Sequence, residues 1–210
     1  CNFPDWNSKR HFLDVGEMAT AVAFGYDWLY NELSASTRTK AANALLKFAF
    51  QQAQNKNWNL NFYEATNNWN QVCNGGLVCA ALASYENNPS EAKDMIEKAL
   101  ESNKPALEVM YSPDGSGYWC YGTLYQVLML AALNSTLGTD NGLSDTPGFS
   151  KTAEYMLYMT GLNSKFFNYS DCAPSSTAAL ASWWFADKYS NPSLLYNELK
   201  MLKNGEYASC

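Results

Sequence analysis

The chain has 210 residues, enough for one sizeable domain or for part of a larger one. Hydrophobic residues make up 47% of it, which predicts a packed core and excludes a disordered chain. The formal net charge of −6 argues against nucleic-acid binding, because affinity for phosphates comes from Lys and Arg. It does not exclude an anionic sugar polymer as a partner, because a local basic patch can oppose the net charge. No apolar run reaches the roughly 20 residues that a membrane span needs.

Apolar residues at helical spacing predict helix after helix along the chain. The expected helices cover residues 12–33, 37–54, 67–85, 90–110, 118–133, 150–160, 175–189 and 192–202. A short strand is expected at 165–169, and polar loops are expected at 55–66 and 138–148. Short connections between helices favour antiparallel hairpins.

This pattern predicts an all-α protein with one domain over residues 1–210, because no linker and no repeat with a fixed motif divides the chain. Stacked helical hairpins can close into an (α/α) toroid or remain an open arc. The number of helical segments favours an incomplete toroid, with fewer helices than a full ring of six hairpins.

The cysteine pattern argues against a metal site. The six cysteines are Cys1, Cys73, Cys79, Cys120, Cys172 and Cys210, with no Cys-x-x-Cys pair and a single histidine to accompany them. Buried free thiols are the favoured interpretation. The chain also lacks a P-loop, a Gly-x-Gly-x-x-Gly segment and a Gly-x-Ser-x-Gly segment, so we expect no metal and no cofactor.

Four amides form a stripe on the expected helix 67–85. Asn67, Asn70, Gln71 and Asn74 recur at i, i+3, i+4 and i+7, without a charged residue among them. Amides suit sugar hydroxyls and carboxylates, since they offer donors and acceptors without a fixed charge. A solvated face or a network of capping amides explains the same spacing, and Asn67 alone fits a helix N-cap. Gly75 and Gly76 indicate the close approach of another backbone or of a ligand.

Three tyrosines form a second stripe, on the helix that follows the Pro113–Gly115 turn. Tyr118, Tyr121 and Tyr125 lie at i, i+3 and i+7. A phenol at the mouth of a cleft can donate a proton, or accept one if its pKa is lowered. Simple packing, with the hydroxyl bonded to a backbone carbonyl, remains the alternative. His11, the only histidine, begins the first helix and is either a cap or a cleft residue.

Several segments resemble the heparinase II/III-like polysaccharide lyase family, in the same order over nearly the whole chain. They are residues 11–14 (HFLD) with 25–29 (GYDWL), then 68–74 (NWNQVCN), 117–123 (GYWCYGT) and 166–171 (FFNYSD). Each motif alone is weak, and their specificity comes from the combination.

The resemblance implies an (α/α) toroid domain, normally followed by a β-sandwich domain that is absent from this chain. It also implies β-elimination at a uronic acid of an acidic polysaccharide. By motif position, Asn68 matches the asparagine that binds the uronate carboxylate, and Tyr118 matches the catalytic tyrosine. Trp69 stands where many relatives have a histidine. Asn67, Trp69, Asn70, Gln71, Tyr121 and His11 are the expected substrate-binding residues.

Two other functions remain open. One is a sugar-binding domain without catalysis. The other is a glycoside hydrolase on a similar toroid, which needs two carboxylates across a cleft; the acids near the motifs are Asp14, Asp27, Glu64 and Asp114. A periplasmic or secreted location is the expectation for a protein of this type.

Overall fold

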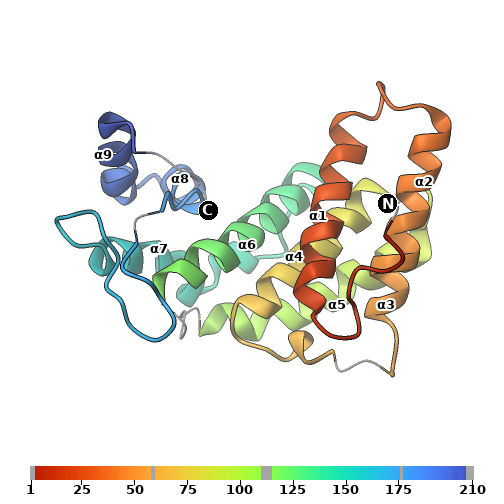
Figure 1. The fold of residues 1–210 in the computed structure, drawn as a ribbon, viewed down its shortest axis with the longest axis horizontal. Coiled ribbons are helices and arrows are strands. Elements are labelled where there is room, and N and C mark those ends of the chain that lie inside the picture. The colour runs from red at the N-terminus through yellow and green to blue at the C-terminus, as the bar shows by residue number, and fades with distance from the viewer. Residues whose placement is uncertain (1–2, 58–59, 110–114, 176, 207–210) are drawn as a thin grey trace.

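The computed structural model describes residues 3–57, 60–109, 115–175 and 177–206, and it confirms the all-α prediction (Figure 1). The α-helices are α1 (Phe12–Trp28), α2 (Ala35–Leu45), α3 (Gln51–Ala53), α4 (Asn68–Ala83), α5 (Pro89–Glu108), α6 (Ser116–Leu137), α7 (Pro147–Met159), α8 (Ala181–Lys188) and α9 (Tyr196–Asn204). A π-helical stretch, Leu46–Phe50, joins α2 to α3, so these elements together form the second expected helix. Short 3-10 turns occupy Asn61–Tyr63, Leu143–Asp145 and Pro192–Leu195.

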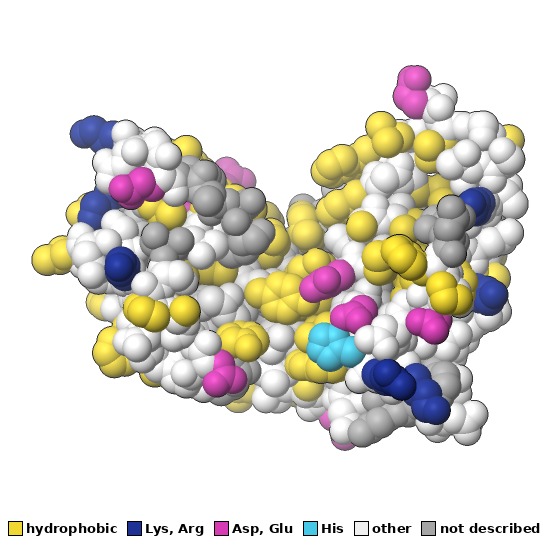
Figure 2. Space-filling view, viewed as in Figure 1, with side chains coloured by type: hydrophobic (Ala, Val, Ile, Leu, Met, Phe, Trp, Pro, Cys, Tyr) yellow, Lys and Arg dark blue, Asp and Glu magenta, His cyan; other side chains and the backbone are white. Residues whose placement is uncertain are grey.

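Two groups of helices stand on either side of a central layer. The first arm consists of α1, α2 and α3, and the second arm consists of α7, α8 and α9 (Figure 1). Between them α4, α5 and α6 cross the middle of the molecule. The space-filling view shows a broad notch between the two arms, which we call the notch below (Figure 2).

The predicted strand at 165–169 is wrong. Within the described part of the chain, the only pairing there is a single antiparallel bridge between Thr160 and Phe166. The Phe167 N–H donates to Met159, whereas the Phe166 N–H donates to Ser175 in the opposite direction. The pairing stops at this one bridge because α7 ends at Met159 on one side of it, and a turn in which the Ser164 N–H donates to Gly161 closes the other side. The helix expected from residue 175 accordingly begins only at Ala181.

Glycines bring α1 and α6 into backbone contact with α4. A Cβ atom on Gly76 of α4 would lie 2.1 Å from the carbonyl oxygen of Gly16 on α1. On the other side of α4, a Cβ atom on Gly75 would lie 2.7 Å from the carbonyl oxygen of Tyr125 on α6. The sequence left open whether these glycines admit a backbone or a ligand, and the structure shows that they admit two backbones.

A buried aromatic cluster holds the second arm to α6. Trp119 of α6 donates its indole N–H to the hydroxyl of Thr152 on α7 at 2.7 Å, and its ring lies 6.2 Å from that of Phe185 on α8. Phe149 of α7 packs on Phe185 with 4.9 Å between the ring centroids. One hydrogen bond and two ring contacts therefore fix α7 and α8 against the central layer.

The free-thiol interpretation is confirmed for Cys73, Cys79, Cys120 and Cys172, all of which are buried and unbonded to another sulfur. Cys1 and Cys210 lie outside the described residues. Burial raises the pKa of the Cys79 thiol to about 12 and raises that of Cys73 further above its usual value.

Replacing Gly76 with alanine tests the contact between α1 and α4. The added methyl group would collide with backbone that cannot rotate away, so Gly76→Ala is expected to lower the free energy of unfolding by about 3 kcal/mol or more. Gly25→Ala on α1 is the control, because no atom lies within 4 Å of its added Cβ, and alanine should raise helix stability by up to about 1 kcal/mol. Urea unfolding followed by circular dichroism measures both variants. Equal stabilities would contradict the close contact.

Candidate functional site

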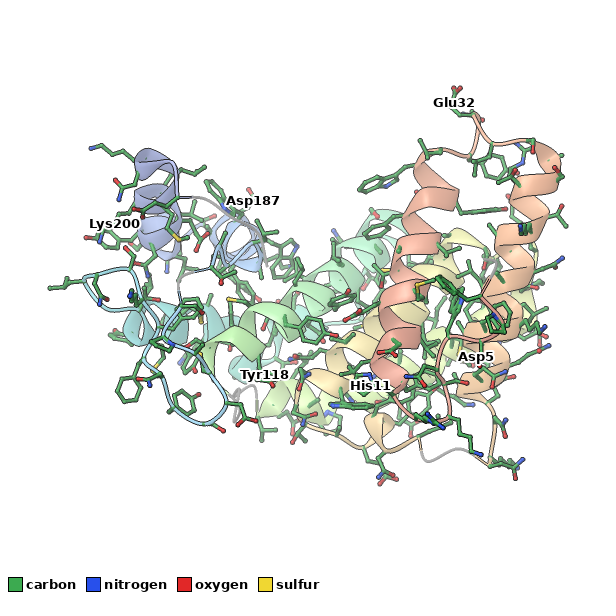
Figure 3. The ribbon with its side chains drawn as sticks, in the orientation of Figure 1. Asp5, His11, Glu32, Tyr118, Asp187 and Lys200 are labelled. Atoms are coloured by element: carbon green, nitrogen blue, oxygen red, sulfur yellow. The ribbon has the colours of Figure 1, made fainter. Side chains whose placement is uncertain are left out.

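Polar and aromatic side chains from α1, α4 and α6 meet on the face shown in Figure 2, between the two arms. We call this group the central cluster. Its members are His11, Asp14, Glu17, Asn68, Trp69, Tyr118, Tyr121 and Tyr125. His11 and Tyr118 lie on either side of the start of α4 (Figure 3). The cluster therefore joins residues from three of the segments that carry the family resemblance.

Glu17 and Tyr121 make the shortest polar contact in the central cluster. The Tyr121 hydroxyl donates to Glu17 Oε1 at 2.5 Å, which links α1 to α6 across α4. Tyr125 packs edge-on against Tyr121, with 5.6 Å between the ring centroids. Tyr121 and Tyr125 of the predicted tyrosine stripe are thus half-buried, with the Tyr121 phenol beside a carboxylate.

His11 stands beside Trp69 and is oriented by Asp14. The imidazole Nδ1 lies 2.6 Å from Asp14 Oδ1, and the ring meets that of Trp69 edge-on at 5.0 Å. Partial burial raises the pKa of Asp14, but hydrogen bonds from Asn7 and His11 outweigh this effect and hold the pKa below its usual range. Because a carboxylate only accepts hydrogen bonds, Nδ1 carries the hydrogen in neutral His11, which leaves Nε2 with its lone pair.

Asn68 lies against Gly122 of α6. A Cβ atom on Gly122 would lie 3.0 Å from Asn68 Cβ, so α4 begins directly against α6 at this point. Tyr118 is one helical turn before Gly122 on α6. Tyr118 is 36% exposed and Asn68 is 8% exposed, so the phenol is open to solvent and the amide lies just beneath the surface.

The amides of the predicted stripe form hydrogen bonds within the protein. Asn67 is the N-cap of α4 and accepts from the Trp69 N–H at 3.2 Å. Asn70 is fully buried, donates to Phe62 and Ser102, and accepts from Asn103. The capping and network interpretation therefore describes these two residues.

Gln71 and Asn74 are buried as well. The Gln71 side-chain oxygen lies against Gly122, and Asn74 donates to the Ser102 hydroxyl at 3.0 Å. Asn103 in turn exchanges two hydrogen bonds with Gln126, each 2.8 Å long, which extends the network from α5 to α6. The structure places Asn70 and Gln71 beneath the central cluster and leaves Asn68 at its edge.

The segment 166–171 packs against the start of α6. The Tyr169 hydroxyl lies 2.6 Å from that of Tyr155 on α7, and Cys172 accepts from the Gly117 N–H at 3.4 Å. Gly115 has φ +104°, and a Cβ atom there would lie 2.2 Å from Cys172 Cβ. Only glycine fits this position, so the loop and the first turn of α6 are locked together beside Tyr118.

A basic pocket adjoins the central cluster. It has a volume of about 440 Å³ and is lined by Ser8, Lys9, Arg10, Phe12, Asn61, Phe62 and Trp69. Lys and Arg side chains gather beside the histidine in Figure 2. These charges offset Asp14 and Glu17 and make the end of the cluster near Trp69 attractive to anions.

Sequence reasoning missed Glu17. It lies one turn after Asp14 on α1, so helical spacing from His11 and Asp14 was the available signal. Of the acids weighed for a hydrolase, Asp27 is exposed at the far end of α1 and Glu64 lies in a separate pocket with Lys98. Asp114 lies outside the described residues. Asp14 and Glu17 are therefore the two carboxylates of the site, and both come from one helix.

Within the described ranges, no three His, Cys, Asp or Glu side chains gather in a way that could hold a metal ion, and no helix has the length and apolar character to cross a membrane. The chain matches no protein-family model and no curated protein.

The stability of the protein should fall with rising pH because of the buried phenols. Half-burial and the hydrogen bond to Glu17 raise the pKa of Tyr121, and burial raises that of Tyr125 to about 12. Unfolded tyrosine ionises near pH 10, at about its unperturbed pKa. Above this pH the unfolded chain releases protons that the folded chain retains, so the free energy of unfolding decreases.

Tyr121→Phe should make this decrease shallower, and Tyr158→Phe should not, because Tyr158 is 85% exposed. Chemical unfolding on either side of pH 10 measures the slope for each protein. A Tyr121→Phe slope equal to that of the wild type would contradict the assignment of Tyr121.

Proposed function

We propose that the central cluster is the active surface of a polysaccharide lyase domain of the heparinase II/III-like type, built on part of an (α/α) toroid. Its substrate is an acidic polysaccharide containing uronic acid, which it cleaves by β-elimination. The observation that carries the proposal is that Asn68 of α4 lies against Gly122 of α6, one helical turn after Tyr118, since Asn68 and Tyr118 come from separate motifs and hold the two groups that the reaction requires.

Each step of the reaction has a candidate residue. Elimination removes the C5 proton of the uronate, breaks the C4–O4 bond, forms the C4–C5 double bond and leaves a proton on O4. The Asn68 amide donates to the carboxylate, where negative charge develops as C5 loses its proton. Tyr118 is the exposed phenol of the stripe and exchanges the proton with the sugar.

Trp69 stands where many members of the heparinase II/III-like family have a histidine. His11 supplies an imidazole next to this position. Its ring lies 5.0 Å from that of Trp69, so an imidazole is present beside this position although it comes from α1. The bond to Asp14 orients the ring, and Nε2 is left to accept the C5 proton or, when protonated, to face the uronate carboxylate. Trp69 offers the sugar a flat apolar surface.

The charges around the cluster support an anionic substrate on one side only. Lys9 and Arg10 line the pocket beside Trp69, whereas Glu17 is engaged by Tyr121 on the side of α1 toward α6. A carboxylated sugar is attracted to the basic end and repelled by Glu17. We therefore place the uronate carboxylate between Asn68 and the basic pocket.

The products of the reaction distinguish this proposal from the two other functions. A lyase forms an unsaturated uronate that absorbs ultraviolet light, and a hydrolase forms new reducing ends without that absorbance. A binding domain forms neither product. The pair Asp14 and Glu17 is the observation that keeps a hydrolase as the second candidate, although carboxylates of one helix do not flank a sugar from opposite sides.

Tyr118→Phe tests the catalytic step. The change removes one hydroxyl from an exposed position, so elimination should fall by about 10² to 10⁴ while the thermal unfolding midpoint stays near the wild-type value. Tyr158→Phe is the matched control and should retain full activity. Turnover of the Tyr118→Phe variant at the wild-type rate would show that Tyr118 is not the proton-transfer residue.

A second pair of variants tests whether the Asn68 amide binds the uronate carboxylate. Asn68→Ala removes the amide and should lower the rate of elimination by about 10² to 10³. Asn68→Asp should lower it at least as much, because the new carboxylate would face that of the uronate. Asn134→Ala, at an exposed position near the end of α6, serves as the control. The assignment of Asn68 fails if the aspartate variant cleaves the polysaccharide as fast as the wild type.

A further inference from the structure

We propose that Trp28 is a second sugar-binding position of this site, a stacking platform at the far end of α1, and that the notch therefore takes several consecutive sugar units of a long acidic polysaccharide. This inference rests on the proposed function and extends it from the bond that is cleaved to the length of chain that is bound.

Trp28 presents a flat apolar surface to solvent. It is 75% exposed, which is unusual for a side chain of this size. One face of its indole is stacked on Phe24, with 5.0 Å between the ring centroids and 5° between the planes. The other face is open. The contact with Phe24 fixes the orientation of the indole, so a ligand that stacks on it loses little freedom in the protein.

The hydrogen bond of Glu17 shows which way this part of α1 faces. Three residues, Glu17, Phe24 and Trp28, fall on one stripe of the helix. Phe24 follows Glu17 by two helical turns, and Trp28 follows Phe24 by about one turn. Glu17 reaches Tyr121 of α6, so the stripe is directed toward the α6 side of α1. Trp28 lies about 16 Å beyond Glu17 along this stripe. In Figure 1, α1 is the helix of the first arm nearest the second arm, and Figure 2, drawn in the same orientation, shows the notch on that side.

The space between the central cluster and Trp28 is open on both helices. On α1, the residues of the stripe between Glu17 and Trp28 are Ala21, which is small and exposed, and Phe24, which is half-buried and stacked on the indole. On α6, the tyrosine stripe continues through Tyr125 to Leu128, both half-buried. A polymer leaving the cluster can follow these surfaces to the indole.

The chemistry of a pyranose ring fits this platform. Its axial C–H groups form an apolar face, and burying that face on an indole removes apolar surface from water. The carboxylate of a uronate projects from the ring edge and stays hydrated. Stacking therefore binds the sugar without a cation, at a distance from the basic pocket beside Trp69.

The test compares oligosaccharides of increasing length, cut from a uronic-acid-containing polysaccharide that the protein cleaves. Trp28→Ala should leave binding and cleavage of the shortest substrate unchanged and should weaken binding of long ones about tenfold, the value of one aromatic contact. Trp28→Phe should restore most of the affinity for long substrates. Leu29→Ala is the control, because this neighbour is 51% exposed but points away from the stripe.

Three outcomes would overturn the inference. The first is equal loss for short and long substrates. The second is unchanged binding of every length. The third is a change in sedimentation of the Trp28→Ala variant without a change in glycan binding, which would assign the indole to a contact between copies of the chain. If the wild type cleaves short substrates but shows no dependence on length, the inference alone fails. If it neither binds nor cleaves any acidic oligosaccharide, the proposed function fails with it.

Discussion

The site depends on one constraint: the backbones of α1 and α6 both lie in direct contact with the backbone of α4. Gly16 and Gly76 let α1 lie directly on α4, and Gly75 does the same for α6 on the opposite side. With larger side chains the outer helices would stand farther apart, and Glu17 could not reach Tyr121. The polar groups of the central cluster therefore owe their proximity to residues that have no side chain and take no part in chemistry.

Beneath this contact, amides fix how the helices are aligned along their lengths. Asn70, Asn103 and Gln126 come from α4, α5 and α6 and are satisfied only when all three helices keep one register. A slip of one residue would leave buried amides unpaired, at a cost of about 1–3 kcal/mol for each. Apolar packing alone would tolerate such slips more readily. Asn68 is thereby held at one place at the edge of the central cluster.

Local patterns predicted the helices and the tyrosine stripe, because apolar spacing and phenol spacing depend on a single helix. They could not place the amides. Asn70 has the same helical position whether it faces water, a sugar or Asn103, and only the packing of α5 against α4 decides among these. Glu17 was missed for a related reason, since its partner Tyr121 is 104 positions away in the chain. The strand expected at 165–169 is reduced to a single bridge because the end of α7 and the turn at 161–164 limit it on either side.

The buried thiols make the interior of this protein accessible to measurement. Cys73 and Cys79 sit on α4, between the helices that the glycines bring together, and their raised pKa values keep them as unreactive thiols. A reagent that modifies thiolates can reach them only when α4 separates from its neighbours. The rate at which these two sulfurs are alkylated therefore reports how often the central layer opens. The measurement needs no substitution and no label attached beforehand.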